Sequence, residues 1–324
     1  MSSWSRQIAR YHPVVGWWYI SNIKAIMAHG GYPFMIRTNS IGVRSDHEYP
    51  LKRPLGRHRA LVIGDSYTQG WGVNNGERWS DYLEKEHPKL DTMNFALTAT
   101  GTDQQLLIYE SIAKPYEADL YILAPCTNNI LRNIAEFGPR VGEQYRSKPY
   151  FTLDDGSLVL HNVPVPNKLA ERKDALKKLS FRSNYRATLP EWVLESSFLN
   201  KLSVAVKDPY EDYKDKDSKS WQLMRAIIQR FIQQVDRKPV FILPLPTVLH
   251  SMRGPTYLSR FRELQDSSEN CYLIDVLPYF SKLSSDDLKR CRFPNDAHYS
   301  ALGHKIVAKA VSDALSEYTP ELAN

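Results

Sequence analysis

Five short apolar runs stand out along the chain, each bounded by polar or turn-forming residues. Their apolar character is nearly continuous rather than alternating, and they are rich in β-branched and aromatic side chains. This pattern is typical of strands that are buried on both faces, as in a parallel sheet. The predicted strands are Ala60–Gly64, Thr92–Leu97, Ala118–Ala124, Pro239–Leu245 and Cys271–Val276.

Segments with helical spacing lie among these runs. Their apolar residues recur every three or four positions, so each segment would present one apolar face to a sheet. The predicted helices are Trp79–Glu86, Asp103–Ile112, Trp221–Gln234 and Ala301–Glu317. Strands that alternate with helices predict an α/β fold with three layers, α/β/α.

The alternation is interrupted from about Phe137 to Ser220, where the composition is strongly charged. Here KPYFTLDDGSLVLHN predicts a β-hairpin with Asp155-Gly156 at its turn, and LAERKDALKKL predicts a basic helical piece. We interpret this stretch as an insertion over the ligand edge of the sheet. The predicted organisation is an N-terminal segment (1–58) packed on a core (59–136 and 236–318), with an insertion or cap region (137–235) that leads into a core helix.

Composition places the chain among globular proteins. The 324 residues are 42% hydrophobic and 24% charged, which argues against disorder. No run approaches the roughly 20 apolar residues of a membrane-spanning helix. The N-terminus lacks the apolar stretch of a secretory signal, so we expect a cytoplasmic protein. The three cysteines, Cys126, Cys271 and Cys291, have no metal-ligand spacing and are expected to be reduced.

The net charge of +6 is unevenly distributed. Residues 1–60 carry nine Lys and Arg against two Asp and Glu, a net +7, whereas the remaining 264 residues are close to neutral at −1. A basic segment of this kind could be an arm that binds nucleic acid or an acidic glycan. It could equally be a charged surface of an ordinary domain, because Trp17, Trp18, Tyr19 and Ile20 resemble packing residues.

A candidate nucleophile follows the first predicted strand, in the sequence Gly64-Asp65-Ser66. A serine at the carboxyl end of a strand, in a tight turn that enters a helix, lies where open α/β sheets bind ligands. The glycine permits the turn, the Ser66 amide could stabilise an oxyanion, and Asp65 could brace the turn through backbone hydrogen bonds. The same three residues also occur in plain turns.

A candidate acid and base lie near the C-terminus. Serine needs a positioned base, and that base needs an acid to orient it. Asp296 and His298 are two residues apart in a predicted loop, so both can face one site. Alternatively, Asp296 caps a turn and His298 is a polar surface residue. His304 is a rival base, but it opens a helical stripe, which favours packing or capping.

Two further loops could supply oxyanion donors. Asn128 and Asn129 follow the third strand, and a side-chain amide there can donate a hydrogen bond to an oxyanion, although an ordinary Asx turn is the alternative. Residues 94–104 form a small-residue loop after the second strand, whose backbone amides could approach a substrate oxygen. Cys126 is a possible nucleophile, but its apolar neighbourhood favours a core residue.

Taken together, GDSYTQG, TNNILRN and NDAHYSALGH resemble the first, third and fifth blocks of the SGNH (GDSL-type) hydrolase superfamily. The resemblance covers nearly the whole chain except much of 137–220. It implies a flavodoxin-like parallel sheet of strand order 2-1-3-4-5. It also implies these roles: Ser66 as nucleophile and amide donor, Asn128 as side-chain donor, Asp296 as acid and His298 as base.

The motifs depart from the family pattern in three places. The second block normally supplies a glycine amide five residues after its Asn, but that position is Ala99, with Gly101 two residues on, so the backbone donor is either of the two. The third block often reads Asn-Asp, whereas here it reads Asn128-Asn129. One residue instead of two separates Asp296 from His298, as in relatives that act on acetylated polysaccharides.

The sequence thus predicts a serine esterase that hydrolyses a short acyl ester, with acetyl on a glycan as the preferred substrate. Asp65 and Asn129 are expected to support the site. The alternatives are an acyltransferase that uses a hydroxyl acceptor, and a non-catalytic module that binds a glycan or polyanion. No metal, organic cofactor or nucleic-acid partner is implied, and the oligomeric state is left open. Because the resemblance extends into residues 1–60, we expect that basic segment to be folded onto the core.

Overall fold

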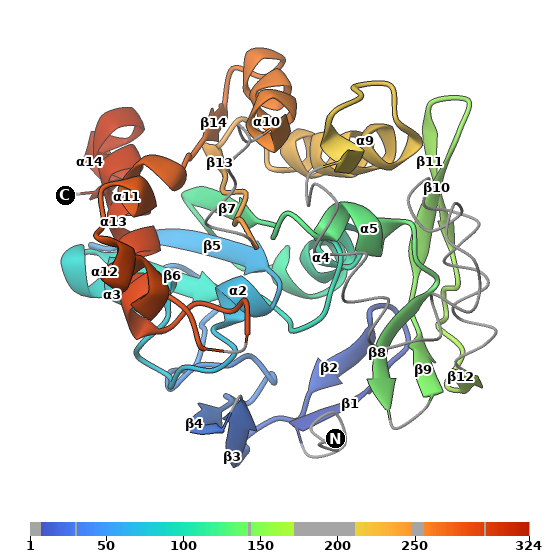
Figure 1. Cartoon of the computed structure of the whole chain (residues 1–324), viewed down its shortest axis with the longest axis horizontal. Coiled ribbons are helices and arrows are strands. Elements are labelled where there is room, and N and C mark those ends of the chain that lie inside the picture. The colour runs from blue at the N-terminus through green and yellow to red at the C-terminus, as the bar shows by residue number, and fades with distance from the viewer. Residues whose placement is uncertain are drawn as a thin grey trace.

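A five-stranded parallel sheet forms the centre of the computed structural model, which describes residues 8–29, 31–141, 144–171, 211–247, 256–294 and 296–323. The spatial order of the strands is β6-β5-β7-β13-β14, which is the predicted order 2-1-3-4-5 (Figure 1). Their bounds are β5 His58–Gly64, β6 Leu90–Asn94, β7 Leu120–Ala124, β13 Val240–Ile242 and β14 Cys271–Leu273.

Helices cover both faces of this sheet, so the predicted α/β/α layering is confirmed. Alternate residues of β5 point to opposite sides: Leu61 and Ile63 join one core cluster, and Ala60 and Val62 join the other. The first cluster is closed by α4 (Thr102–Ile108), α5 (Asn129–Asn133), α9 (Lys219–Gln234) and α10 (Thr256–Asp266). The second is closed by α3 (Trp79–Glu86), α11 (Leu277–Ser281) and α13 (Ala301–Tyr318).

The remaining helical pieces are short: α2 Ser66–Gln69, a π-helical turn Tyr109–Ala113 that continues α4, a 3-10 turn Glu211–Tyr213, α12 Ser285–Arg290 and α14 Pro320–Ala323. The predicted fourth strand, Pro239–Leu245, is shorter in the structure. Pro244 has no backbone N–H to donate to a ladder, so β13 ends at Ile242. Backbone hydrogen bonds continue past this point, from Leu243 N to Leu123 O and from Leu245 N to Pro125 O, both at 2.9 Å, and an isolated bridge joins Leu245 to Cys126.

Two hairpins precede the sheet in sequence and lie together on one side of the molecule (Figure 1). They are β1 (Ala9–His12) with β2 (Gly16–Tyr19), and β3 (Lys24–His29) with β4 (Tyr32–Arg37). Trp17 Nε1 donates to Thr98 O at 3.1 Å, and Tyr19 Oη donates to Thr98 Oγ1 at 2.7 Å. The N-terminal residues therefore contact the loop after β6.

Ion pairs account for much of the positive charge of residues 1–60. Arg53 pairs with Asp119 at 3.2 Å, Arg57 with Glu84 at 3.3 Å and Arg59 with Asp91 at 2.8 Å. The three arginines lie just before or within β5. Their partners lie in α3 (Glu84), in β6 (Asp91) and directly before β7 (Asp119). These three arginines are thus bound to the core instead of forming a free arm.

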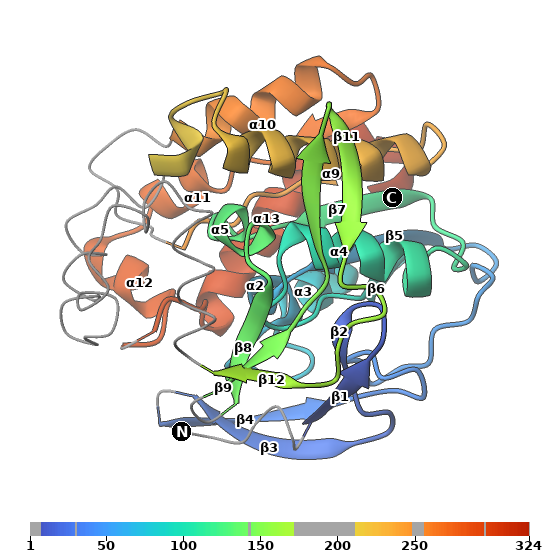
Figure 2. The ribbon, with the colours of Figure 1, turned by 90° about the vertical axis from the view of Figure 1, so that its right-hand side faces the viewer.

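The predicted hairpin of the insertion is present as β10 (Tyr150–Asp154) and β11 (Ser157–His161), and it lies against α9 (Figure 2). Its turn residues have positive φ angles, 46° for Asp155 and 78° for Gly156, as a two-residue hairpin loop requires. A second, antiparallel sheet has the order β12-β9-β8, with β8 Phe137–Val141, β9 Gln144–Ser147 and β12 Leu169–Glu171.

The helix predicted from LAERKDALKKL is wrong at its start. Residues Leu169–Glu171 form β12 and pair with β9 in antiparallel register. An edge of β9 was available to accept a third strand, and such tertiary pairing overrides local helix propensity. The rest of that predicted helix lies outside the described residues.

Candidate active site

The loop after β5 is shaped by close contacts. A Cβ at Gly64 would lie 2.5 Å from Thr68 Oγ1 and 2.7 Å from Ala124 O, so no larger residue fits there. Asp65 caps α2, because its carboxylate accepts a 3.0 Å hydrogen bond from Tyr67 N. Ser66 is consequently the first residue of α2, just after the carboxyl end of β5. This is the edge at which parallel α/β sheets bind their ligands.

His298 and Asp296 are brought to Ser66 from the other end of the chain. His298 Nε2 lies 2.8 Å from Ser66 Oγ, and His298 Nδ1 lies 2.5 Å from Asp296 Oδ1. An ionised carboxylate only accepts, so Nδ1 carries the ring proton and Nε2 presents a lone pair to the Ser66 hydroxyl. The three predicted residues thus form one hydrogen-bonded series in the order that nucleophilic catalysis by serine requires.

Asp296 is held in its ionised form. Burial alone would raise the pKa of its carboxyl group, but contacts with His29 and His298 outweigh burial and hold the pKa well below its usual range. The backbone amide of His298 also donates to Asp296 Oδ1 at 2.7 Å. A carboxylate that stays charged near neutral pH can stabilise the imidazolium that forms when His298 takes a proton.

The His298 ring is supported by an aromatic neighbour. Tyr67 stacks on it with ring centroids 4.8 Å apart, and Tyr299 meets Tyr67 edge-on at 5.1 Å. Tyr67 is buried, which raises the pKa of its hydroxyl well above the usual value and keeps the side chain neutral. The stacking therefore fixes the imidazole plane without adding a charge beside it.

Asp65 links the nucleophile turn to the loop after β7. Its buried carboxylate accepts from Asn129 Nδ2 at 2.7 Å, from Arg132 Nη1 at 3.2 Å and from Cys126 N at 3.4 Å. Asn129 and Arg132 also both donate to Thr100 O. Asn129 and Arg132 thus link the Asp65 turn to the loop after β6, so the network joins three sequence blocks. Asp65 and Asn129 were predicted as supporting residues, whereas Arg132 was not.

Asn128 lies beside this network but faces outward. Its side chain is exposed, and its Oδ1 accepts a 3.4 Å hydrogen bond from Thr247 Oγ1. Among the described residues, no acceptor engages its Nδ2 group. The amide of Asn128 is therefore available to a ligand, unlike the buried amide of Asn129.

Ala99 and Gly101, the two candidate backbone donors, have different surroundings. The Gly101 amide donates to Gln104 Oε1 at 3.4 Å as part of the cap of α4. A Cβ at Gly101 would lie 2.5 Å from Asp103 Oδ1, so this glycine serves the helix start. Ala99 adopts a left-handed φ of 66°, and its amide meets no acceptor in the described part of the chain.

The rival residues have structural roles. His304 is buried, and its Nδ1 accepts a 3.2 Å hydrogen bond from Trp79 N at the start of α3, which fits the expectation of packing or capping. Cys126 is also fully buried, and burial raises the pKa of its thiol well above the usual value. Neither side chain can replace His298 or Ser66.

His29 is, after Arg132, a second residue of this site that the sequence did not reveal. Its Nε2 lies 2.8 Å from Asp296 Oδ1, although 267 positions separate the two residues. One donor atom each from His29, Asp296 and His298 lie within 4.8 Å of one another, a spacing that could suit a metal ion. The shared Asp296 oxygen, however, already receives the Nδ1–H of His298.

Comparison with known proteins agrees with this geometry. Residues 62–306 match the model of the GDSL-like Lipase/Acylhydrolase family, which is well over half of the chain. The chain belongs to this family. It is thus a carboxylic ester hydrolase of the GDSL type, as its motifs had indicated. A search of curated proteins returned no significant match.

Solved structures similar to this GDSL-family chain include three lipolytic proteins. The psychrotrophic esterase EstA from Pseudoalteromonas sp. is 10% identical, with a TM-score of 0.42 over 81% of this chain and 99% of EstA. The lipase/acylhydrolase from Enterococcus faecalis is 9% identical, with a TM-score of 0.42 over 80% and 96% of the two chains. A G-D-S-L family member from Veillonella parvula is 12% identical, with a TM-score of 0.39 over 82% and 100%.

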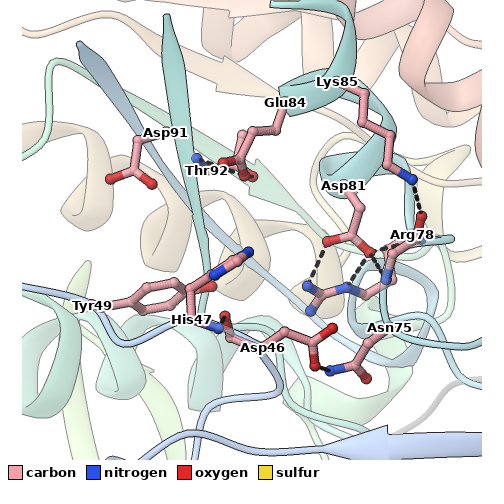
Figure 3. A pocket seen from close by; sticks show the side chains of 12 residues that line it. Asp46, His47, Tyr49, Asn75, Arg78, Asp81, Glu84, Lys85, Asp91 and Thr92 are labelled. Carbon is pink, nitrogen blue, oxygen red and sulfur yellow. Dashed lines mark hydrogen bonds and ion pairs between the residues drawn. The ribbon is translucent and has the colours of Figure 1, made fainter. Parts of the chain in front are cut away.

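This GDSL-family hydrolase also has a charged cavity of about 220 Å³ (Figure 3). Its lining includes none of Ser66, His298 and Asp296. Two of its charged groups, Arg78 and Asp81, pair at 2.6 Å, and the neutral amide of Asn75 donates to Asp46 at 2.9 Å. The cavity joins the 45–49 loop to α3 and β6. Across the described ranges, no helix is long and apolar enough to span a membrane.

Proposed function

We propose that this GDSL-family hydrolase cleaves a short acyl ester, with acetyl on a glycan as the preferred substrate, and that Ser66, His298 and Asp296 carry out the reaction. The single observation behind the catalytic assignment is the series of contacts Ser66–His298–Asp296, at 2.8 and 2.5 Å. His298 removes the proton of Ser66 as Oγ attacks the ester carbonyl, and Asp296 orients the imidazole.

The oxyanion of the tetrahedral intermediate requires donors that are free in the resting enzyme. The amide of Ser66, the amide of Ala99 and the Nδ2 group of Asn128 are our candidates. Gly101 is the weaker choice, because its amide caps α4. His298 then donates its proton to the leaving alcohol, and water attacks the acyl-enzyme to release the acid and restore Ser66.

The nature of the acyl group and its carrier rests on the motif. One residue separates Asp296 from His298, which resembles relatives that act on acetylated polysaccharides. This feature supports a small, polar substrate. Location in the cytoplasm stays a prediction from the sequence.

The test is a panel of acetyl, butyryl and long-chain esters together with acetylated glycans, on the wild type and on Ser66→Ala. We expect acetate release from the glycans, little hydrolysis of long chains, and no turnover by Ser66→Ala at an unchanged melting temperature. A preference for long-chain lipids would contradict the substrate, and an active Ser66→Ala would contradict the nucleophile.

Two additions separate the alternatives. Product analysis in the presence of a sugar acceptor would reveal an acyltransferase as acylated acceptor in place of free acetate. A fluorophosphonate probe that fails to label the wild type, combined with salt-sensitive binding to polyanions, would indicate a non-catalytic module.

A further inference from the structure

His29 ends strand β3 of the N-terminal hairpin and contacts the acid of the proposed triad. Its Nε2 lies 2.8 Å from Asp296 Oδ1, the same oxygen that receives His298 Nδ1. The exposed fractions of the two side chains in this contact are 18% for His29 and 25% for Asp296. The His29 Nε2 atom itself is buried and forms no hydrogen bond of regular geometry among the described residues, so its contact with Asp296 is a close electrostatic one.

Trp71 determines which nitrogen of His29 carries the proton. The indole Nε1–H of Trp71 lies 2.9 Å from His29 Nδ1, and an indole nitrogen can only donate. Nδ1 must therefore present a lone pair, so the proton of the neutral ring is on Nε2. That proton is on the side of Asp296, which makes the contact attractive.

The ring of His29 is packed on two sides by aromatic residues. Phe293 meets it edge-on with centroids 5.8 Å apart, and Trp71 does so at 6.0 Å. Phe293 approaches so closely because Gly72, at φ 98°, has no side chain: a Cβ there would lie 2.5 Å from Phe293 Cε2. Sequence neighbours of Ser66 and of Asp296 thus enclose the ring.

The acid of the triad needs such a support. Asp296 lies in a loop, is one-quarter exposed, and its backbone amide makes a single 3.2 Å hydrogen bond to Phe293 O. An acid that orients the base must be held in the productive geometry, and a displacement of about 1 Å can cost roughly 100-fold in rate. His29 contacts Asp296 from a different part of the chain and shields one side of it.

We propose that His29 is a positioning residue of this hydrolase: its Nε2–H, fixed by Trp71, holds Asp296 in place to orient His298. The inference rests on the catalytic roles proposed above. The N-terminal hairpin thereby becomes part of the catalytic apparatus, through the series Trp71–His29–Asp296–His298–Ser66. The tautomer that Trp71 imposes also disfavours a metal ion between these residues, because the ligand atom of His29 would have to lose its proton.

The test uses four variants of the full chain. His29→Phe retains a ring but removes both nitrogens, and His29→Gln keeps a side-chain N–H donor. Trp71→Phe keeps an aromatic ring against His29 but removes the indole N–H, so the His29 ring can adopt either tautomer. Tyr32→Phe is the matched control. Tyr32 belongs to the same hairpin, and its ring contacts that of Phe293 with centroids 5.6 Å apart, without reaching Asp296. Active sites are counted with a fluorophosphonate, so kcat is expressed per reactive serine.

We expect His29→Phe to lower kcat on a short acyl ester by about 10-fold or more, with KM changed by less than about twofold. His29→Gln should recover most of the activity, Trp71→Phe should give an intermediate value, and Tyr32→Phe should match the wild type. The downfield NMR signal of the proton between His298 and Asp296 should move or disappear in His29→Phe. If the role of His29 were purely structural, this signal would stay unchanged.

The inference requires both effects. An unchanged kcat per reactive serine, or an unmoved proton signal, would overturn it. If His29→Phe does not fold, the same two measurements on Trp71→Phe decide. Loss of wild-type activity in EDTA with recovery in Zn²⁺ would also overturn it and indicate a metal site. Failure of the proposed function is distinguishable, because the wild type would then lack fluorophosphonate labelling at Ser66.

Discussion

The side-chain amide of Asn129 donates a 2.7 Å hydrogen bond to the buried carboxylate of Asp65. This contact joins the turn that carries Ser66 to the loop after β7. It also explains why an amide suits position 129 here: a second carboxylate would face Asp65 in a site without solvent.

The first prediction follows from this contact. Asn129→Asp should lower the free energy of unfolding at neutral pH by about 3 kcal/mol, because it removes a donor from a buried carboxylate and adds a like charge. Arg132 can offset only part of the repulsion, since it already pairs with Asp65 at 3.2 Å. Urea unfolding at pH 7 measures the loss. Equal stability of variant and wild type would contradict the role of the contact.

The neighbouring residue should behave in the opposite way. Asn128→Ala should reduce kcat by about 100- to 1000-fold, the usual cost of one oxyanion donor. Its stability should change little, because the side chain is exposed and its oxygen makes one long hydrogen bond. Kinetics and thermal unfolding of Asn128→Ala and Asn129→Asp, measured together, should separate catalysis from stability. A nearly normal kcat for Asn128→Ala would remove this side chain from the oxyanion hole.

Asp296→Asn should lower kcat by about 10⁴-fold, because the amide favours the wrong tautomer of His298. The substitution also affects stability in a pH-dependent way. Contacts with both histidines depress the pKa of Asp296 in the folded protein, so its ionisation stabilises the fold above about pH 4, the unfolded value. This stabilisation fades as the pH falls further. The free energies of unfolding of the wild type and Asp296→Asn should therefore become more similar as the pH falls. A constant difference between them from pH 7 to pH 3 would contradict the assignment.

His304 predicts a second pH effect, with a different origin. Burial lowers the pKa of this ring to about 3 from 6.5. Between these two values the unfolded chain binds the extra proton and the folded chain does not, so stability falls as the pH falls from 6.5 towards 3. The contribution is at most about 1.4 kcal/mol per pH unit. His304→Asn, which retains an acceptor for Trp79 N, should flatten this part of the stability profile. An unchanged slope in the variant would show that other groups cause it.

Local patterns were enough to predict most of the central fold. The run Ala60–Gly64 and the segment Trp79–Glu86 coincide closely with β5 and α3, because both are dominated by burial against the sheet. The three triad candidates could also be predicted from the sequence, because Ser66, Asp296 and His298 lie in recognisable motifs. The untested part of that prediction is their catalytic role.

Long-range contacts were not predictable. Nothing in the sequence around His29 distinguishes it from a surface histidine of a hairpin, and its contact with Asp296 arises only when the β3–β4 hairpin meets the C-terminal loop. Residues Leu169–Glu171 illustrate the same limit, because their helical composition yields to an open strand edge. The choice between Ala99 and Gly101 depended on the cap of α4, which is a matter of three-dimensional packing.

The ion pairs of Arg53, Arg57 and Arg59 have a consequence for how this chain can be divided. The family match begins at residue 62, so all three arginines lie upstream of it. A chain shortened to the matched region would leave Asp119, Glu84 and Asp91 without these partners, expose the surface at Thr98 that Trp17 and Tyr19 cover, and remove His29 from Asp296. We therefore expect a chain cut at the boundaries of the family match to be less stable than the full chain.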